Sequence, residues 1–363
     1  MCVALRFFYT VARVIIADKA GNTEKNEKTE KHMNAIVLAG GFGSRLRPLT
    51  DSVPKPMLKI ANVPMLDYVV AWLVRYGFTD LVFTLGYLPE VVRDFVSGYK
   101  GISCRFKLET EPLGTAGAVK NAEDCLDDVF VVASGDALSN IDLDKMLDFH
   151  FRGGADVTMA CSAVQNPRLY GVVNAAEDGT INGFIEKPDT LEYGNLVNAG
   201  VYVMNKSVLN EVPRGVKFDF SRDLFPSLVA AGRIKAFVHR DYWCDIGDKL
   251  SYYKANFFMK DGGFYPSVPS FNSERYASAL KSGSLVSNSA VTVGGAFDSI
   301  IGEGARVASS AEIADCVVLD GALVTGRHKF SIIGADFVVD LPELWTNTGN
   351  YVDKNDKIFQ TGI

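Results

Sequence analysis

The sequence predicts an α/β protein in which a doubly wound sheet domain is followed by a short left-handed parallel β-helix. Two observations carry this prediction. From residue 34 to about residue 260, short apolar runs alternate with helical stretches, which is typical of a parallel sheet covered by helices. After residue 283, apolar residues recur every six positions, as in the coils of a β-helix. A chain of 363 residues is long enough for both units.

The composition is that of an ordinary globular protein and excludes several classes. Hydrophobic residues make up 48% of the chain and charged residues 22%, which excludes a disordered or collagen-like chain. The apolar run from Val3 to Ala17 is interrupted by Arg6 and Arg13, and it is shorter than the roughly 20 residues of a membrane span. The formal net charge of −6 gives no overall attraction for nucleic acid or anionic lipid. We therefore expect neither nucleic acid nor a membrane as a partner.

The six cysteines are scattered, and no Cys-x-x-Cys pair suggests zinc binding or thiol exchange. They are Cys2, Cys104, Cys125, Cys161, Cys244 and Cys316. This usage fits free thiols in a reducing compartment, so we expect a cytoplasmic protein.

Residues 1–33 differ from the rest of the chain. An apolar stretch is followed by a polar, charge-rich run that cannot build a core. We expect this extension to be disordered, or Met33 to be the true start of the protein. An amphipathic anchor over Leu5–Ile16 and a signal peptide are the less favoured interpretations of the same residues.

Strands and helices are expected to alternate along the first domain, residues 34–260. Strands are predicted at short apolar runs, and helices where apolar residues recur at helical spacing. The expected strands are Ala35–Ala39, Leu81–Leu85, Cys104–Leu108, Val129–Ala133 and Ala155–Cys161, and the expected helices are Met65–Tyr76 and Pro89–Val96. Ligands of such sheets bind beyond the carboxyl ends of the strands, so chemistry is expected in the loops after Ala39, Leu108 and Ala133.

The C-terminal third is expected to contain three segments. Residues 261–283 are rich in Gly, Ser, Pro and aromatic residues, which predicts a connector. Residues 284–340 carry the six-residue period and are expected to form the β-helix. Residues 341–363 are a poorly patterned tail. Since exposed coil faces commonly join copies of a chain, we expect a homo-oligomer.

The six-residue period is moderate in strength. It is carried by Ile301, Val307, Ile313 and Leu319, with small residues and Gly between them. Gly295 is expected to break the pattern upstream, and residues 328–330 to interrupt it downstream. The hexapeptide repeat therefore predicts only a few irregular coils.

The segment from Leu38 to Leu58 predicts a phosphate-binding loop. A buried strand runs into residues 40–43, Gly-Gly-Phe-Gly, where missing side chains let backbone N–H groups approach phosphate oxygens. Arg45, Arg47 and Lys55 supply positive charge, and Lys55 lies between two prolines that stiffen its backbone. A triphosphate would match this charge. The spacing fits neither a dinucleotide fingerprint nor a P-loop, and the alternative is a tight turn whose arginines are solvated.

The residues from Gly40 to Met57 resemble the hallmark of the sugar-1-phosphate nucleotidyltransferase family, GGxGxRLxPLT followed by PKPM. The resemblance extends over residues 35–258. It implies a Rossmann-like, GT-A-like domain that transfers a nucleotidyl group from an NTP to a sugar 1-phosphate and releases pyrophosphate. Within the family, three fragments resemble the mannose-1-phosphate guanylyltransferases, also called GDP-mannose pyrophosphorylases, which implies GTP and mannose 1-phosphate as substrates. These fragments are EPLGTAGAV at 111–119, FDFSRDLFP at 218–226 and YWCDIGD at 242–248.

The implied reaction brings two anions together, so it needs cations and positioning rather than a strong base. By resemblance, Arg45 stabilises the charge on the leaving pyrophosphate and Lys55 grips the α-phosphate region. Asp136 and Asp245 match the two family carboxylates that hold Mg²⁺, a cation that prefers oxygen ligands. The nucleotide-binding residues that the resemblance implies are Leu38, Ala39, Gly40, Gly41, Gly43, Glu109 and Gly114.

Four residues match the sugar pocket of the family. Lys187 matches the lysine that pairs with the sugar phosphate, and Glu186 matches a carboxylate that accepts hydrogen bonds from sugar hydroxyls. Gly171 and Asn198 complete the pocket, the glycine by allowing close backbone approach. Standing alone, the Glu-Lys-Pro sequence would be an equally plausible surface turn.

The nucleobase is expected to meet the loop LETEPLGTAG. The Watson–Crick edge of guanine offers two adjacent donors, and a carboxylate is an acceptor only. Glu109 or Glu111 facing that edge would therefore favour guanine, whereas a carboxylate would repel the carbonyls of thymine and uracil. The sequence does not distinguish which of the two glutamates faces the base. The alternative for either one is a solvated side chain or a cap of the following helix.

Three other functions fit parts of the sequence. A glucose-1-phosphate thymidylyl-, uridylyl- or cytidylyltransferase would share the phosphate chemistry and differ in base and sugar. A catalytically silent paralogue that binds nucleotide sugar and regulates a partner would be expected to lose the cationic loop or a metal carboxylate, and Arg45, Lys55, Asp136 and Asp245 are all present. A β-helix acyltransferase would need a general base in a long stack of coils, where His328 is the only histidine.

Overall fold

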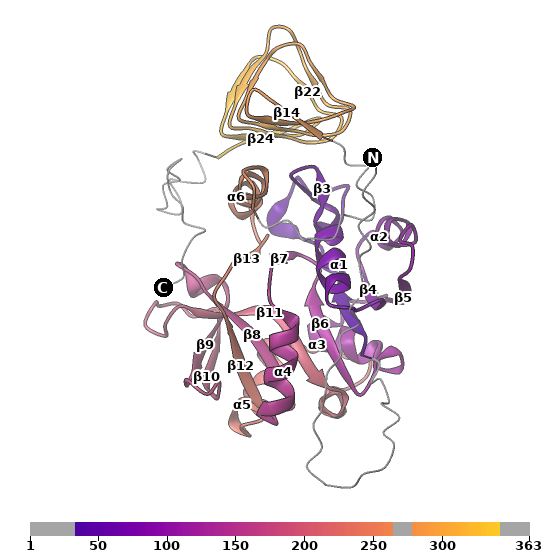
Figure 1. Cartoon of the computed structure of the whole chain (residues 1–363), viewed down its shortest axis with the longest axis vertical. Helices are drawn as coiled ribbons and strands as arrows, with labels where there is room; N and C mark the ends of the chain where they lie inside the picture. Colours follow the sequence, from indigo (N-terminus) through magenta and orange to yellow (C-terminus); the bar gives the residue numbers. More distant parts are fainter. Residues whose placement is uncertain (1–32, 264–277, 342–363) are drawn as a thin grey trace, which may run out of the picture.

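A computed structural model describes residues 33–263 and 278–341 as an α/β domain with a stack of β-coils at one end (Figure 1). Most of the N-terminal extension, part of the connector and nearly all of the tail lie outside the described residues. The expectations for those segments stay predictions. Met33, the described end of the extension, is partly buried against the core of the domain.

A nine-stranded sheet forms the centre of the first domain. Its main path runs β10-β9-β11-β6-β1-β4-β5, with β8 paired to β11 and β12 paired to β8. The strands are β1 (Ala35–Leu38), β4 (Asp80–Leu85), β5 (Ser103–Leu108), β6 (Val129–Ser134), β8 (Val157–Ala163), β9 (Gly171–Ala175), β10 (Ile181–Glu186), β11 (Leu196–Asn205) and β12 (Ile234–His239). The neighbours β6, β1, β4 and β5 are parallel, as the apolar runs predict.

The other half of the sheet is mixed, so the expectation of a parallel sheet holds only in part. β11 runs antiparallel to β6, β8 and β9, and β9 runs antiparallel to β10. Residues 176–180 are all that joins β9 to β10. Because a parallel connection needs a crossover of a dozen or more residues, so short a link allows only an antiparallel pair.

Helices cover both faces of the sheet, which confirms the doubly wound α/β prediction. Ala35 and Val37 of β1 pack in one buried cluster and Ile36 packs in another, because successive side chains of a strand point to opposite faces. Helices α1, α2 and α4 contribute to the first cluster, and α3 and α5 to the second. The helices are α1 (Met65–Arg75), α2 (Pro89–Val96), α3 (Gly114–Asn121), α4 (Leu143–Gly153), α5 (Phe225–Ala230) and α6 (Lys249–Lys260).

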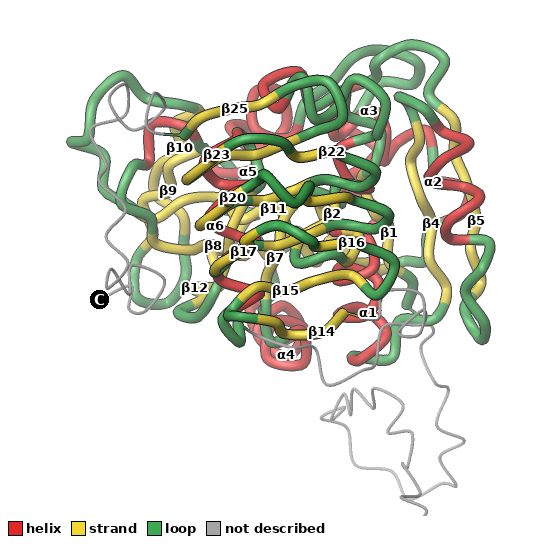
Figure 2. Tube along the Cα trace, turned by 90° about the horizontal axis from the view of Figure 1, so that it is seen from above, coloured by secondary structure: helices red, strands yellow, loops and turns green. Residues whose placement is uncertain are grey.

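Three short parallel sheets wrap around one core to form the β-helix. The first has β15, β18, β21 and β24 with an antiparallel strand at each edge, the second β16, β19 and β22, and the third β17, β20 and β23. Figure 2 shows the stack with β14 at one edge and β25 at the other. The strands are β14 (Ser278–Lys281), β15 (Ser284–Ser287), β16 (Val291–Thr292), β17 (Gly295–Phe297), β18 (Ile300–Ile301), β19 (Arg306–Val307), β20 (Glu312–Ala314), β21 (Val317–Val318), β22 (Leu323–Val324), β23 (Arg327–Lys329), β24 (Ser331–Ile333) and β25 (Val338–Asp340).

Three members of the six-residue period lie in this core, since Ile301, Val307 and Ile313 are at most 1% exposed. The fourth, Leu319, is only partly buried and packs against the neighbouring cluster that contains α6, because the spacing shortens here and Val318 takes the core position. The expected breaks at Gly295 and at residues 328–330 are wrong. Gly295 opens β17, and His328 of β23 pairs in register with Ile313. The coil continues because the ladder is made by backbone groups and a ring nitrogen of His328 is satisfied by the Thr325 carbonyl at 2.9 Å.

The hand of the coils stays a prediction. β14 pairs with β15, so the described residues 278–281 of the expected connector lie within the first sheet of the β-helix. Within residues 33–263 and 278–341, every helix is too short or too polar to cross a bilayer.

Candidate active site

The loops after β1, β5 and β6 meet at one edge of the sheet. β1 is parallel to both of its neighbours, so the carboxyl ends of these strands lie together. Leu38 ends β1, and its carbonyl accepts a hydrogen bond from the Gly135 N–H at 2.9 Å, while Ala39 is buried. The structure thus places the glycine loop beside the loop that carries Asp136.

Gly40 is closely packed by Glu109 and by the backbone of Gly86. A Cβ atom on Gly40 would lie 2.7 Å from Oε1 of Glu109, and one on Gly86 would lie 2.6 Å from the Gly40 carbonyl oxygen. Open space surrounds Gly41. Gly40 therefore lies directly against Glu109, whereas Gly41 borders open space.

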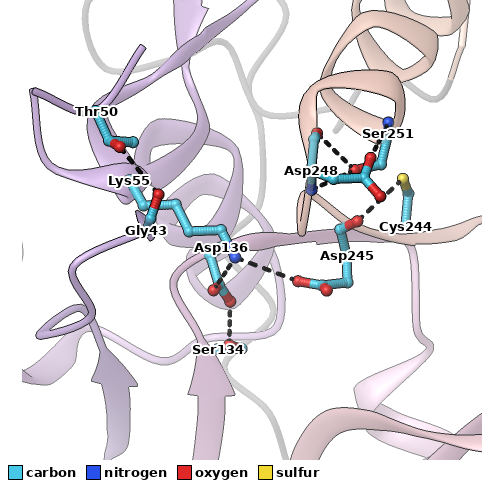
Figure 3. A network of polar contacts seen from close by, with 9 residues as sticks. All are labelled: Gly43, Thr50, Lys55, Ser134, Asp136, Cys244, Asp245, Asp248 and Ser251. Carbon is cyan, nitrogen blue, oxygen red and sulfur yellow. Dashed lines mark hydrogen bonds and ion pairs between the residues drawn. The ribbon is translucent and has the colours of Figure 1, made fainter. Parts of the chain in front are cut away.

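Gly43 turns the chain toward the cationic residues. It adopts a left-handed conformation with φ of 60°, which glycine tolerates best, and its carbonyl accepts a hydrogen bond from Oγ1 of Thr50 at 2.9 Å (Figure 3). Arg45 follows in a short 3-10 helix (Ser44–Leu46) and is exposed. A Cβ on Gly247 would lie 3.3 Å from Nη2 of Arg45 and 2.8 Å from Oδ2 of Asp245, so both charged groups reach this glycine.

Lys55 lies between the two predicted metal carboxylates (Figure 3). Its Nζ is 2.5 Å from Oδ2 of Asp136 and 3.5 Å from Oδ1 of Asp245. Lys55 is only 8% exposed. Ser134, which the sequence did not single out, donates a hydrogen bond to the other oxygen of Asp136. The Ser-Gly-Asp sequence at the end of an apolar strand was the available signal.

A small antiparallel ribbon brings the two carboxylates together. Asp136 immediately precedes β7 (Ala137–Ser139), and Asp245 ends β13 (Trp243–Asp245). Asp245 lies opposite Ala137 in the ribbon, and the Ile246 N–H bonds to the Asp136 carbonyl at 3.1 Å. A pairing between distant segments therefore builds the site.

Burial and the opposite charges of neighbouring groups shift the pKa of each of these three side chains in opposite directions. Burial disfavours the charged form of Lys55, but Asp136 and Asp245 outweigh it and raise the lysine pKa. Burial also opposes ionisation of Asp136, yet the attraction of Lys55 and the hydrogen bonds from Lys55 and Ser134 lower its pKa. For Asp245, burial and the like charge of Asp136 win over Lys55 and Arg45, so its pKa is raised. Lys55 is thus held as an ammonium ion.

The expected base loop connects β5 to α3. Glu109 is half-buried, and its Oε2 accepts a hydrogen bond from the Leu113 N–H at 3.2 Å. Burial raises the Glu109 pKa. Gly114 has a φ of +70°, and a Cβ there would lie 2.8 Å from the Phe218 carbonyl oxygen. Glu109 is therefore fixed against the glycine loop, whereas Glu111 is exposed.

The four expected sugar residues come from β9, β10 and β11. Glu186 lies opposite Gly171, where a Cβ would be 3.0 Å from Oε2 of Glu186. Lys187 has a φ of 50°, and its Nζ is 3.3 Å from Oε1 of Glu186. Asn198 donates from Nδ2 to the hydroxyl of Tyr202 at 2.9 Å. Gly171, Glu186 and Lys187 therefore form one group, and Asn198 lies on the neighbouring strand β11.

Two aromatic rings connect the sugar residues with the carboxylates. The ring of Tyr170, which precedes Gly171, packs edge-on to Trp243 at 5.4 Å between centroids, and Trp243 begins the strand that ends in Asp245. The Trp243 indole N–H donates to the Ala199 carbonyl at 2.8 Å. Burial and the nearby charge of Asp245 raise the pKa of Tyr170, which therefore stays neutral.

A groove runs beside Lys187. Its lining residues are Phe184, Ile185, Glu186, Lys187, Ser221, Arg222 and Pro226. Ser221 and Arg222 were not singled out from the sequence, where they occur only within the fragment FDFSRDLFP at 218–226. A second cation thus lines the same groove as Lys187.

Asp136 and Asp245 fit a magnesium ion. Within the described ranges, no group of three or more His, Cys, Asp and Glu side chains converges on one point. Mg²⁺ does not need such a cage, because it keeps several waters and is bound by one or two carboxylates together with phosphate oxygens. Two facing carboxylates beside a phosphate loop are a donor set of this kind.

Comparisons with known proteins find relatives of this chain. Residues 34–262 match the family model described as nucleotidyl transferase. Mannose-1-phosphate guanylyltransferase of Mycobacterium tuberculosis (strain ATCC 25618 / H37Rv) is 33% identical over 297 residues, which cover 80% of this chain and 81% of the relative. Mannose-1-phosphate guanylyltransferase 1 of Arabidopsis thaliana is 38% identical over 231 residues, 61% of this chain. The match spans 63% of that plant protein, less than two thirds of its length.

A solved structure shares the fold of the first domain. HddC from Yersinia pseudotuberculosis, crystallised in a complex with GMP-PN, superposes with a TM-score of 0.54 and is 30% identical. The similarity covers 62% of this chain and 98% of HddC.

Proposed function

The chain belongs to the nucleotidyl transferase family, and we propose that it transfers a guanylyl group from GTP to mannose 1-phosphate, giving GDP-mannose and pyrophosphate. The observation that carries the proposal is the buried Lys55 ammonium between Asp136 and Asp245, beside the loop that carries the glycines 40, 41 and 43. The relatives named mannose-1-phosphate guanylyltransferase favour this base and this sugar.

The reaction is an in-line displacement at phosphorus. An oxygen of mannose 1-phosphate attacks the α-phosphorus of GTP, and the bond from that phosphorus to the bridging oxygen of the β-phosphate breaks. Lys55 neutralises charge at the α-phosphate, and Arg45 stabilises the charge on the departing pyrophosphate. Asp136 and Asp245 would hold Mg²⁺, which when bound neutralises phosphate charge. Positioned charge is therefore the main contribution of this chain to the rate.

Glu109 is proposed to read the guanine base. It is half-buried beside Gly40, and one of its oxygens is held by the Leu113 N–H, whereas Glu111 is exposed. A fixed carboxylate favours the paired N1–H and 2-amino donors of guanine. Leu38, Ala39, Gly41, Gly43 and Gly114 are proposed to contact the nucleotide through their backbone.

Lys187 is proposed to bind the phosphate of the sugar, and Glu186 and Asn198 its hydroxyls. The ammonium of Lys187 is half-exposed in an open groove, where an anion has access to it. Gly171 packs closely beside Phe184 and Glu186, because a Cβ there would lie 2.5 Å from the Phe184 ring and 3.0 Å from Oε2 of Glu186. This arrangement accepts a phosphate at one end and hydroxyls at the other.

A cytoplasmic location and a homo-oligomeric assembly are also proposed. The described cysteines are free, which fits a reducing cytoplasm. A homo-oligomer formed through the β-helix would use the outer faces of its coils.

Pyrophosphate release by the full chain tests the proposal. GTP, dTTP, UTP, CTP and ATP are each paired with mannose 1-phosphate and glucose 1-phosphate in the presence of Mg²⁺. Release confined to GTP with mannose 1-phosphate is the expected result. Release with another pair would replace the proposed substrates, and no release with any pair by a protein that binds nucleotide sugar would favour a silent regulatory paralogue.

A further inference from the structure

The hairpin that follows Lys55 lies against the β-helix. Strands β2 (Lys59–Ile60) and β3 (Val63–Pro64) form it, and Figure 1 shows β3 on the side of the domain that faces the coils, near α6. The Leu58 N–H bonds to the Lys55 carbonyl at 3.1 Å, so the Lys55 turn leads directly into the hairpin. Contacts that fix the hairpin therefore also fix the backbone from which the Lys55 side chain extends.

The ammonium of Lys59 lies between two carboxylates of the β-helix. Its Nζ is 2.6 Å from Oδ2 of Asp320 and 3.1 Å from Oε2 of Glu303. The Glu303 N–H bonds to Oδ1 of Asp320 at 2.8 Å, so two successive coils hold the carboxylates together. The side chain of Lys59 is 22% exposed, and those of Glu303 and Asp320 are about half exposed. This ion cluster joins the two parts of the chain.

The tip of the hairpin is held by the same surroundings. Ala61 and Asn62 have φ values of 47° and 67°, a conformation that costs energy for a side chain such as that of alanine. The Ala61 N–H donates to Oδ1 of Asn256 in α6 at 2.9 Å. Nδ2 of Asn62 donates to the carbonyl of Ile301 in the β-helix at 3.1 Å. Both hydrogen bonds are buried, so the unfavourable turn is kept by α6 and the coils.

An apolar cluster joins the cation-bearing loops to the coils. Leu46 follows Arg45, and Leu58 lies three residues beyond Lys55. Both leucines are at most 5% exposed. They share a core with residues of the β-helix and of α6, namely Ile300, Val317, Ile332, Tyr252, Tyr253 and Met259. The segments that carry both proposed catalytic cations therefore rest on the β-helix.

From these contacts we infer that the β-helix positions Lys55 for the reaction and that Lys59 is the positioning residue through which it does so. The inference rests on the proposed function. Partly exposed ion pairs contribute little to folding stability. A reacting group displaced by about 1 Å, in contrast, lowers a rate by up to about 100-fold. Loss of the Lys59 charge should therefore lower kcat more than it lowers the stability of the fold.

Lys59→Met in the full chain tests this, because it removes the ammonium and keeps the apolar stem. We expect kcat to fall about tenfold, with the KM for mannose 1-phosphate and the melting temperature unchanged. The paired change Glu303→Gln with Asp320→Asn should lower kcat to the same extent. Lys59→Arg retains the charge and should recover most of the rate.

A control variant and a hydrogen-exchange measurement distinguish positioning of Lys55 from the loss of any ion pair in the β-helix. Glu312→Gln is the matched control, because it breaks the 3.3 Å pair with Arg327 within the β-helix and should leave kcat unchanged. Amide hydrogen exchange over residues 55–64 should become faster in Lys59→Met and not in Glu312→Gln. Exchange and kcat that both stay at the wild-type level in Lys59→Met, or an equal loss in Glu312→Gln, would overturn the inference.

The exchange measurement also separates this inference from the proposed function. A wild-type chain that is inactive with every substrate pair defeats the proposed function. Faster exchange in Lys59→Met would then still support positioning of the Lys55 segment, and unchanged exchange would reject it.

Discussion

The ammonium of Lys55 lies 2.5 Å from a carboxylate oxygen of Asp136, at a site where Lys55 is buried and Asp136 is partly buried. Each stabilises the charged form of the other, since the pKa of Lys55 is raised and that of Asp136 is lowered in spite of burial. A phosphate group arriving here would meet a cation that is already fixed in place.

Lys55→Ala should lower kcat by about 10²- to 10³-fold, the scale of one lost preorganised charge donor. It should also lower the melting temperature, because Asp136 and Asp245 would face each other without a cation. Initial rates of pyrophosphate release, taken well below the new melting temperature, measure the first effect. Lys107→Ala, which removes the ion-pair partner of the exposed Asp124, is the control and should keep the wild-type rate.

Asp136→Asn and Asp245→Asn should each abolish turnover at ordinary Mg²⁺ concentration. An amide keeps the shape of the side chain but loses the negative charge that a divalent cation requires. Titration calorimetry with Mg²⁺ and nucleotide should show weaker metal binding in both variants. Asp124→Asn changes an exposed carboxylate and should behave like the wild type. Near-normal rates in both site variants would remove these residues from the metal site.

Glu109→Gln should reduce the preference for GTP over UTP by about tenfold or more. The new amide donor would meet the guanine donors, and the lost charge would remove the repulsion of the uracil carbonyls. Glu111→Gln is the matched control, because this side chain is exposed in the same loop. The ratio of kcat/KM for GTP to kcat/KM for UTP measures this preference. An unchanged ratio in Glu109→Gln would show that Glu109 does not read the base.

Lys187→Ala should raise the KM for mannose 1-phosphate about tenfold or more, the value of one hydrogen bond to a charged group. The KM for GTP should change little, because Lys187 lies in the groove with Glu186 and not in the glycine loop. Lys145→Ala, on the surface of α4, is the control. The reverse pattern, with the nucleotide KM raised alone, would move Lys187 out of this role.

The stability of the protein should fall below pH 6.5 in part because of His150. Burial outweighs the groups that favour protonation and lowers the pKa of His150 below its ordinary value of 6.5. The unfolded chain therefore binds a proton at a pH where the folded chain does not, so the free energy of unfolding decreases as the pH falls below 6.5.

His150→Asn should reduce this pH dependence, by up to about 1.4 kcal/mol for each pH unit. Urea unfolding at pH 7.5 and pH 5.5 measures the difference. The pKa of His239 is also lowered by burial, so some dependence should persist in the variant. Identical pH dependence in the variant and the wild type would show that His150 does not contribute.

Local sequence accounts for the parts of the site that lie close together in the chain. Residues 40–43 and Lys55 are predictable because glycine, proline and an adjoining apolar strand restrict the backbone within a few residues. The apolar runs likewise located the five expected strands and the two expected helices to within two residues at each end, but the helices α3 and α4 and the short strands β2, β3 and β7 of the same stretch were not predicted. The hairpin of β9 and β10 was not predicted, nor was the antiparallel direction of β11 against β6, β8 and β9, and these pairings together make that half of the sheet mixed.

Pairing between distant segments decided the rest. Asp136 and Asp245 come together only because β7 and β13 form a ribbon, and no periodicity in either segment specifies that partner. The choice between Glu109 and Glu111 likewise depends on the close approach of Gly40. The family motif, the charged residues and most of the coil period can be read from the order of residues alone, because these features depend on neighbours in the chain. The pairing of the charges and the contact between the β-helix and the Lys55 segment emerge only from the folded arrangement, because burial and ion pairing depend on proximity in space.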